Sequence, residues 1–153
     1  MDFKIRKALP EDVPHIVRLL ADDELGETRE KLSDPLAPEY YAAFDAINND
    51  RNSYLMVAEL NGKIIGTLQL TLITYLTYCG GRRGLIEGVR TDKTLRGHGI
   101  GTTMVKWAIE KSQEAGCHLV QLTTDKKRSD ALAFYEGLGF IASHEGLKLH
   151  FTP

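Results

Sequence analysis

The 153-residue sequence has few of the features that would place it in a membrane or in a disulfide framework. Its two cysteines, Cys79 and Cys117, lie far apart without CxxC spacing, which argues against a disulfide scaffold. No apolar run reaches the roughly 20 residues that span a bilayer, since glycine, glutamine and threonines interrupt the stretch 63–78. No charged-then-apolar leader is recognisable, so we expect a cytoplasmic protein without membrane contact.

An excess of charge of one sign is also lacking. The 19 lysines and arginines nearly balance 21 aspartates and glutamates, which gives a formal charge of −2. A nucleic-acid partner usually requires a basic face, so we expect a small-molecule partner and no nucleic acid. No group of histidines, cysteines and aspartates has the spacing of metal ligands, and we expect no metal.

The hydrophobic pattern predicts one α+β domain over residues 1–153. Strands are expected at 3–7, 54–60, 63–78, 85–91, 118–124 and, as a final pair, from 139 to the C-terminus. Asn61-Gly62 predicts a hairpin turn. Helices are expected from Pro10 over Leu20, at 39–48, from the glycine-rich stretch to about 115, and from a cap at Ser129 or Asp130 to 137. The order β-α-α-β-β-β-α-β-α-β-β predicts three layers, with a mixed, mostly antiparallel sheet of about seven strands and about four helices.

The most informative segment is Arg96-Gly97-His98-Gly99-Ile100-Gly101, where a strand runs into the start of a helix. The first N–H groups of a helix have no intrahelical partner, and glycines let a phosphate approach them, so the segment suits a pyrophosphate. A Walker loop would need Gly-Lys-Ser/Thr, and a dinucleotide fingerprint would need its third glycine one residue later. On spacing alone, a tight turn before a helix stays an equal alternative.

Two motifs in order resemble the GNAT superfamily of N-acetyltransferases. The 96–101 segment, preceded by Ile86-Glu87-Gly88-Val89, looks like that family's Arg/Gln-x-x-Gly-x-Gly/Ala loop and its Ile-Glu-x-Val strand. The segment 131–140 (ALAFYEGLGF) resembles the family's Ala-x-x-Phe-Tyr-x-x-x-Gly-Phe ending. The resemblance covers about residues 85–140 and agrees with the expected order of elements. It implies transfer of an acetyl group from acetyl-CoA to a primary amine, but says little about the acceptor.

The resemblance also implies how the coenzyme is held. In the family, a bulge splays the strand that corresponds to 87–91 from its neighbour, and the pantetheine arm lies there like an extra strand. Backbone groups of Val89 and Thr91 are then available to it, unless this is an ordinary paired strand. The cofactor-binding residues implied in this way are Val89, Arg90, Thr91, Arg96, Gly97, His98, Gly99, Ile100, Gly101 and Thr102.

Direct transfer needs a neutral amine, and an alkyl amine of pKa near 10.4 is only about 0.04% neutral at pH 7. A general base is therefore useful. The resemblance gives this role to Glu87, which is predicted to act directly or through water. The alternative is a glutamate that orders the loop by pairing with Arg82, Arg83 or Arg90.

Tyr135 stands at the family's Phe-Tyr position, where a phenol protonates or stabilises the departing thiolate of the coenzyme. A tyrosine that only packs on the last helix is the alternative. Arg128 occupies a position where the family often has an asparagine that binds the pantetheine arm. We count Arg128 among the cofactor-binding residues, because with Lys126 and Lys127 it offers positive charge to the 3′-phosphate, although a solvated basic turn is the alternative that is favoured at first sight.

Three functional hypotheses follow. The first is an acetyltransferase with a small-molecule amine or, less favoured, a protein as acceptor. The second is a GNAT-like module that binds acyl-CoA without turnover. The third is a modifier of aminoacyl-tRNA, which the near-neutral charge disfavours. Dimers are usual in proteins of this kind, so a homodimer is the assembly that the resemblance implies.

Overall fold

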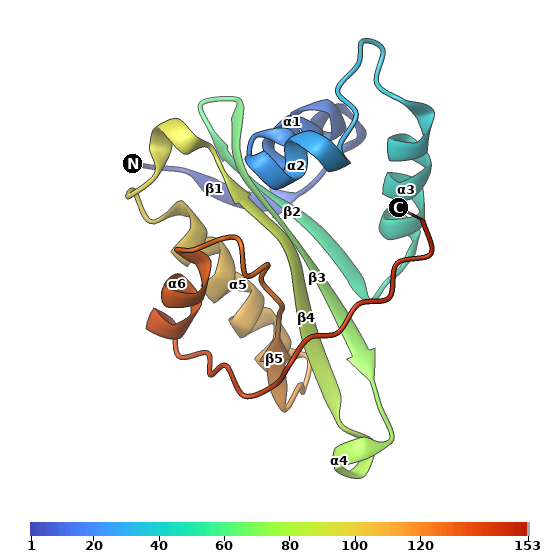
Figure 1. Ribbon diagram of the computed structural model, residues 1–153, viewed down its shortest axis with the longest axis vertical. Helices are drawn as coiled ribbons and strands as arrows, with labels where there is room; N and C mark the ends of the chain where they lie inside the picture. Colours follow the sequence, from blue (N-terminus) through green and yellow to red (C-terminus); the bar gives the residue numbers. More distant parts are fainter. Residues whose placement is uncertain (153) are drawn as a thin grey trace. The chain divides into compact units, whose positions relative to one another are not determined.

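The computed structural model describes residues 1–152, and its contacts divide the chain into two compact units, Met1–Gln121 and Leu122–Pro153. The first unit contains a five-stranded sheet and most of the helices (Figure 1). Its strands are β1 (Lys4–Lys7), β2 (Ser53–Leu60), β3 (Lys63–Thr74), β4 (Arg82–Thr91) and β5 (Leu119–Gln121). Its helices are α1 (Val13–Ala21), α2 (Glu24–Arg29), α3 (Pro38–Asn49), the irregular turn α4 (Thr77–Gly80) and α5 (Ile100–Glu114), with 3-10 turns at Pro10–Asp12 and Lys93–Leu95.

The sheet is mixed and lies between two helical layers. The strand order is β1-β2-β3-β4-β5, with a parallel β4–β5 pair and antiparallel pairs elsewhere. Gly66 of β3 and Gly84 of β4 face α5 so closely that an added Cβ would press on Met104 and Ser112. The opposite face packs against α1 and α3 through a cluster that includes Val17, Phe44, Val57 and Ile64. The predicted three-layer α+β arrangement is confirmed for this unit.

The predicted hairpin turn at Asn61-Gly62 and the predicted helix end at Gly116 are both confirmed. Asn61 and Gly62 both adopt positive φ, 49° and 80°, and join β2 to β3 as a hairpin. Gly116, at φ 79°, ends α5, because glycine, which has no Cβ, adopts this left-handed conformation more readily than any other residue. The N–H groups of Gly116 and Cys117 then bond back to the carbonyls of Gln113 and Ser112.

The expectation of about seven strands is wrong, since the described residues contain five. The predicted strand 118–124 is shorter, at 119–121, and no strand forms between 139 and 152. Alternation in the tail indicated a half-buried strand, but a strand also requires a partner, and an isolated two-stranded hairpin is marginal in water. The apolar side chains of the tail are accordingly exposed: Ile141, Leu147, Leu149 and Phe151.

The second unit contains one regular element, α6 (Ala131–Gly137), among its described residues. Asp130 stands at its N-cap as predicted, but its side chain makes no capping hydrogen bond.

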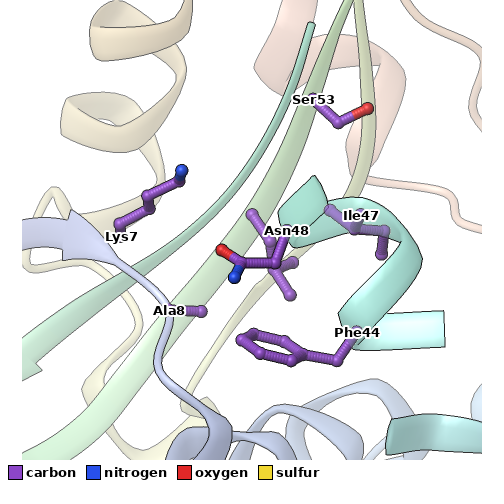
Figure 2. A pocket seen from close by; sticks show the side chains of 7 residues that line it. Lys7, Ala8, Phe44, Ile47, Asn48 and Ser53 are labelled. Carbon is purple, nitrogen blue, oxygen red and sulfur yellow. The ribbon is translucent and has the colours of Figure 1, made fainter. Parts of the chain in front are cut away.

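Helix α3 closes one end of the first unit. Figure 2 shows Phe44 of α3 pointing toward Ala8, the residue that follows β1, with Asn48 beside it. The crevice that these side chains share with Lys7 and Ser53 has no room for a water molecule. It is therefore part of the packing and not a ligand site.

A charged group anchors the start of the chain to the sheet. Arg6 of β1 donates to both oxygens of the buried Asp12 at 2.7 and 3.0 Å, and also to Glu59 of β2. Burial alone would raise the pKa of Asp12, but hydrogen bonds from Arg6 and from the Leu9 N–H outweigh it and lower the pKa below 3.8.

The stabilisation that ionised Asp12 gains from its hydrogen bonds with Arg6 and the Leu9 N–H is present above pH 3.8. It is lost as the pH falls through the lowered pKa of Asp12. We expect Asp12→Asn to lower the free energy of unfolding at pH 7 by about 2–3 kcal/mol. Urea denaturation at pH 7 and pH 3 measures the difference, which should shrink at pH 3. An equal difference at both pH values would contradict this account.

Candidate active site

Strand β4 carries a bulge in its second half. Along β3, Gln69 pairs with Glu87 and Thr67 with Arg90, so two steps on β3 oppose three on β4. Gly88 supplies the extra residue at φ 65°, a conformation that favours glycine. The bulge that the resemblance implied is confirmed.

The other edge of β4 is only partly covered. Strand β5 pairs with β4 in parallel over Arg83, Gly84 and Leu85 alone. Beyond Leu85, no strand of the described residues lies on this edge. The backbone from Ile86 to Thr91 thus has one edge open to an extended ligand, as β-augmentation requires.

The bulge also decides which side chains share a face of the sheet. In a regular strand, residues three apart point to opposite faces. Glu87 and Arg90 point to the same face, because their antiparallel partners Gln69 and Thr67 are two residues apart. Gly66, next to Thr67, faces α5, so Glu87 and Arg90 face the α1–α2 side.

The corner between α1 and α2 lies against this half of β4. Asp23 accepts a hydrogen bond from the Gly26 N–H at 2.6 Å and so caps α2. Its other oxygen forms an ion pair with Arg90 Nε at 3.3 Å, and both side chains are about one-fifth exposed, at 22% and 20%. Asp22 pairs with Lys93, just after β4, at 3.0 Å. Two ion pairs therefore hold the corner to β4 and to the turn that follows it.

The Glu87 side chain is exposed, and no hydrogen bond or ion pair joins it to another residue of the range 1–152. The alternative of a glutamate ordered by an arginine is not realised. Arg82 and Arg83 donate to backbone and amide oxygens within the unit, and Arg90 pairs with Asp23.

The glycine-rich segment forms the exposed start of α5. Gly97 and Gly99 have φ of 85° and 78°, and an added Cβ at either would meet open space. Gly99 is the N-cap, and no side chain caps the helix. The first amides of the helix, at Ile100, Gly101 and Thr102, have no acceptor within an α-helix and suit an anion. Arg96 and His98 flank the loop and are exposed.

An open hollow of about 370 Å³ lies beside α2, lined by Ala21, Glu27, Glu30, Lys31 and Leu32. The Tyr40 hydroxyl of α3 donates to Glu30 at 3.0 Å and accepts from the Lys31 N–H at 2.9 Å. Burial, together with the nearby Glu30 carboxylate, raises the pKa of Tyr40, so its phenol stays a neutral donor. The volume is within the range of small-molecule sites.

The second unit holds the other predicted catalytic residue. Tyr135 lies in α6, with ring contacts to Phe134 at 5.0 Å and to Phe140 at 5.8 Å between centroids. After the helix, Gly139 has φ 98°, and the N–H groups of Gly139 and Phe140 donate to the carbonyls of Glu136 and Tyr135. This is a Schellman cap, with its usual apolar contact between Tyr135 and Phe140. The Phe-Tyr-x-x-x-Gly-Phe pattern is thus explained as a capped helix that fixes the tyrosine ring.

Arg128 belongs to the turn before α6. Its N–H donates to the Asp125 carbonyl, and its own carbonyl accepts from Ala131. Lys127 N–H also donates to the Asp125 side chain. The turn is ordered by the backbone, and the part of Arg128 in cofactor binding stays a prediction.

Sequence reasoning missed helix α2. Asp23 ahead of Glu24 is an N-cap signal that would have located the helix. The ion pair of Asp23 with Arg90 had no local signal, because the two residues belong to distant segments. Among the described residues, no group of three or more His, Cys, Asp or Glu is placed to hold a metal ion. Within the same range, no helix is both long and apolar enough to cross a membrane.

The comparison with family models identifies this architecture. The model of the GNAT acetyltransferase family matches residues 16–140, and the chain belongs to this family.

Two curated relatives indicate the range of chemistry in the family. The chain is 33% identical over 95 residues to an aminoalkylphosphonate N-acetyltransferase of Salmonella typhimurium, covering 62% of the chain and 61% of the relative. It is 35% identical over 88 residues to a glucosamine 6-phosphate N-acetyltransferase of Trypanosoma brucei brucei, covering 58% of each. The chain thus spans less than two thirds of either relative.

Solved structures match over nearly the whole chain. A transcriptional regulator from Bacillus halodurans C-125 is 54% identical with a TM-score of 0.96, covering 98% of this chain and 100% of that one. A predicted acetyltransferase from Clostridium acetobutylicum, solved with acetyl-CoA, is 27% identical with a TM-score of 0.75, covering 97% and 96%.

Proposed function

We propose that the protein is an N-acetyltransferase that moves an acetyl group from acetyl-CoA directly to a primary amine of a small molecule. The observation that carries the proposal is the open edge of the bulged β4, together with the uncapped glycine start of α5 that follows in the chain. Such an edge suits the amides of a pantetheine arm, and such a helix start suits a pyrophosphate. Family membership of 16–140 supports the same coenzyme and one domain across both units.

Acetyl-CoA supplies the activated acetyl thioester when bound. Val89 and Thr91 would bind the pantetheine arm through their backbone, and the amides of 97–102 would hold the phosphates, helped by Arg96 and Arg128. Glu87 would take a proton from the acceptor ammonium, either directly or through water. Tyr135 would donate its hydroxyl proton to the coenzyme sulfur.

The acceptor side is proposed to be the α1–α2 side of the sheet. Glu87 faces it, and the wall of the hollow beside α2 contains two carboxylates, Glu27 and Glu30, and one lysine, Lys31. The carboxylates outnumber the lysine, and a wall of net negative charge favours an ammonium over an anionic acceptor. The homodimer implied by the resemblance stays a prediction.

The proposal is tested by release of free coenzyme A thiol from acetyl-CoA across a panel of amines, amino acids, polyamines and amino sugars. Turnover with one group of small amines is expected. Tight coenzyme binding without turnover on any acceptor, proteins and aminoacyl-tRNA included, would show that the protein is a binding module and not an enzyme. Absence of coenzyme binding in a calorimetric titration would overturn the proposal.

A charge placed in the loop should weaken coenzyme binding specifically. Aspartate and asparagine both tolerate a left-handed backbone, and the space around Gly99 is open, so Gly99→Asp and Gly99→Asn form a matched pair. We expect the Asp variant to bind coenzyme A about tenfold more weakly than the Asn variant, because its carboxylate repels the pyrophosphate. Calorimetry at low and high salt measures both affinities, and the difference between the two variants should become smaller as the salt concentration rises. Equal affinities would contradict a phosphate site here.

A further inference from the structure

Arg90 lies on the same face of β4 as Glu87, and only one residue of β3 lies between their pairing partners. Their partners Thr67 and Gln69 are two residues apart, which corresponds to about 7 Å along a strand. An extended arginine side chain spans such a distance. A guanidinium on this face is therefore a natural partner for the Glu87 carboxylate.

In the structure, the Arg90 guanidinium contacts other groups. Arg90 Nε pairs with Asp23 at 3.3 Å, and Arg90 Nη1 donates to the Val89 carbonyl at 2.8 Å. Asp23 is itself fixed, because its Oδ1 accepts from the Gly26 N–H at 2.6 Å. The α2 cap and the ion pair thus share one carboxylate, which holds Arg90 toward the α1–α2 corner.

We propose that Asp23 is a positioning residue that holds the Arg90 guanidinium away from Glu87 and so leaves the Glu87 carboxylate for the acceptor amine. The inference rests on the base role proposed for Glu87 above. An arginine paired with Glu87 would occupy the carboxylate lone pairs through charge-assisted hydrogen bonds and compete with the ammonium of the acceptor. The ion pair therefore contributes to activity by what it prevents, in addition to joining α2 to β4.

The two roles of Asp23 are separable by substitution. Asp23→Asn keeps an oxygen that accepts from the Gly26 N–H but loses the charge that binds Arg90. Arg90→Gln removes the competing cation, and the double variant removes both. If the released arginine causes the defect, the second substitution repairs the first; if the ion pair acts only as a tether, it does not.

We expect Asp23→Asn to lower kcat about tenfold, with less than a twofold change in KM for acetyl-CoA. The double variant should have the same kcat as Arg90→Gln alone, because it carries that substitution and cannot be faster than the single variant. Asp22→Asn breaks the neighbouring, more exposed pair with Lys93 and is the matched control, with kcat expected within about twofold of the unchanged protein. A double variant as slow as Asp23→Asn would overturn the proposal, as would an unimpaired Asp23→Asn.

A crystal structure of Asp23→Asn tests the same step without the reaction. The Arg90 guanidinium is expected within about 4 Å of the Glu87 carboxylate, the distance of an ion pair. An arginine that stays against residue 23 or points into solvent would overturn the inference. If instead Arg90 moves as expected but Glu87→Gln turns over normally, the base role of the proposed function has failed and the effect of Asp23 on Arg90 has not.

Discussion

Glu87→Gln is expected to lower kcat at pH 7 by about 100-fold or more, with the affinity for coenzyme A unchanged. The amide is nearly isosteric but cannot accept a proton, and removal of a positioned general base typically costs 10²–10⁴-fold. Because the Glu87 side chain is exposed and makes no hydrogen bond or ion pair within residues 1–152 that glutamine would lose, stability should change by less than about 0.5 kcal/mol. Steady-state kinetics with a saturating acceptor, together with calorimetry for the coenzyme, separates catalysis from binding.

The pH dependence of the same variant identifies the mechanism. The neutral fraction of an amine of pKa 10.4 rises from about 0.04% at pH 7 to about 4% at pH 9. A base is needed less as the amine deprotonates by itself, so the defect of Glu87→Gln should shrink as the pH rises. Glu114→Gln, at the exposed C-terminal end of α5, is the control and should match the unchanged protein throughout. A defect that stays constant with pH would assign Glu87 a role other than proton removal.

The parts of the fold that the sequence predicted are those with local causes. A hairpin at Asn61-Gly62 and a helix end at Gly116 depend on the backbone freedom of one or two residues, and both were confirmed. The start of α5 at a glycine loop is also local. Amphipathic periodicity found α3, whose apolar side chains recur every three to four residues.

The parts that could not be predicted depend on partners that are distant in the sequence. Alternation in 146–151 indicates a strand as well as the alternation in β1 does, yet only β1 has a neighbouring strand. The length of the β4–β5 pair is likewise set by where β5 ends. For the candidate site, a motif located Glu87, but plain alternation would put Arg90 on the opposite face. The bulge at Gly88 reverses this; the family resemblance implied a bulge in this strand, but an isolated glycine was the only local sign of its position.

The position of α2 depends on one glycine, and its substitution should have the largest effect on stability. Gly26 is buried, and a Cβ added there would overlap the carbonyl oxygen of Leu20 in α1. Backbone atoms cannot turn aside as a side chain can, so α2 would have to move away from α1. We expect Gly26→Ala to lower the free energy of unfolding by about 3 kcal/mol, at the upper end of the usual cost of overpacking, and Tm by about 6–12 °C.

The same displacement should reach the chemistry, because Asp23 caps α2 through the Gly26 N–H. A shifted cap loosens the pair with Arg90, so Gly26→Ala should also lower kcat at temperatures where the variant is folded. Gly137→Ala is the matched control: it lies in a helix, has no positive φ and would meet nothing within 4 Å, so alanine should leave stability equal or up to about 1 kcal/mol higher. Calorimetric melting of both variants decides the matter. If the Tm of Gly26→Ala equals that of the unchanged protein, α1 and α2 are not in the close contact on which the placement of Asp23 depends.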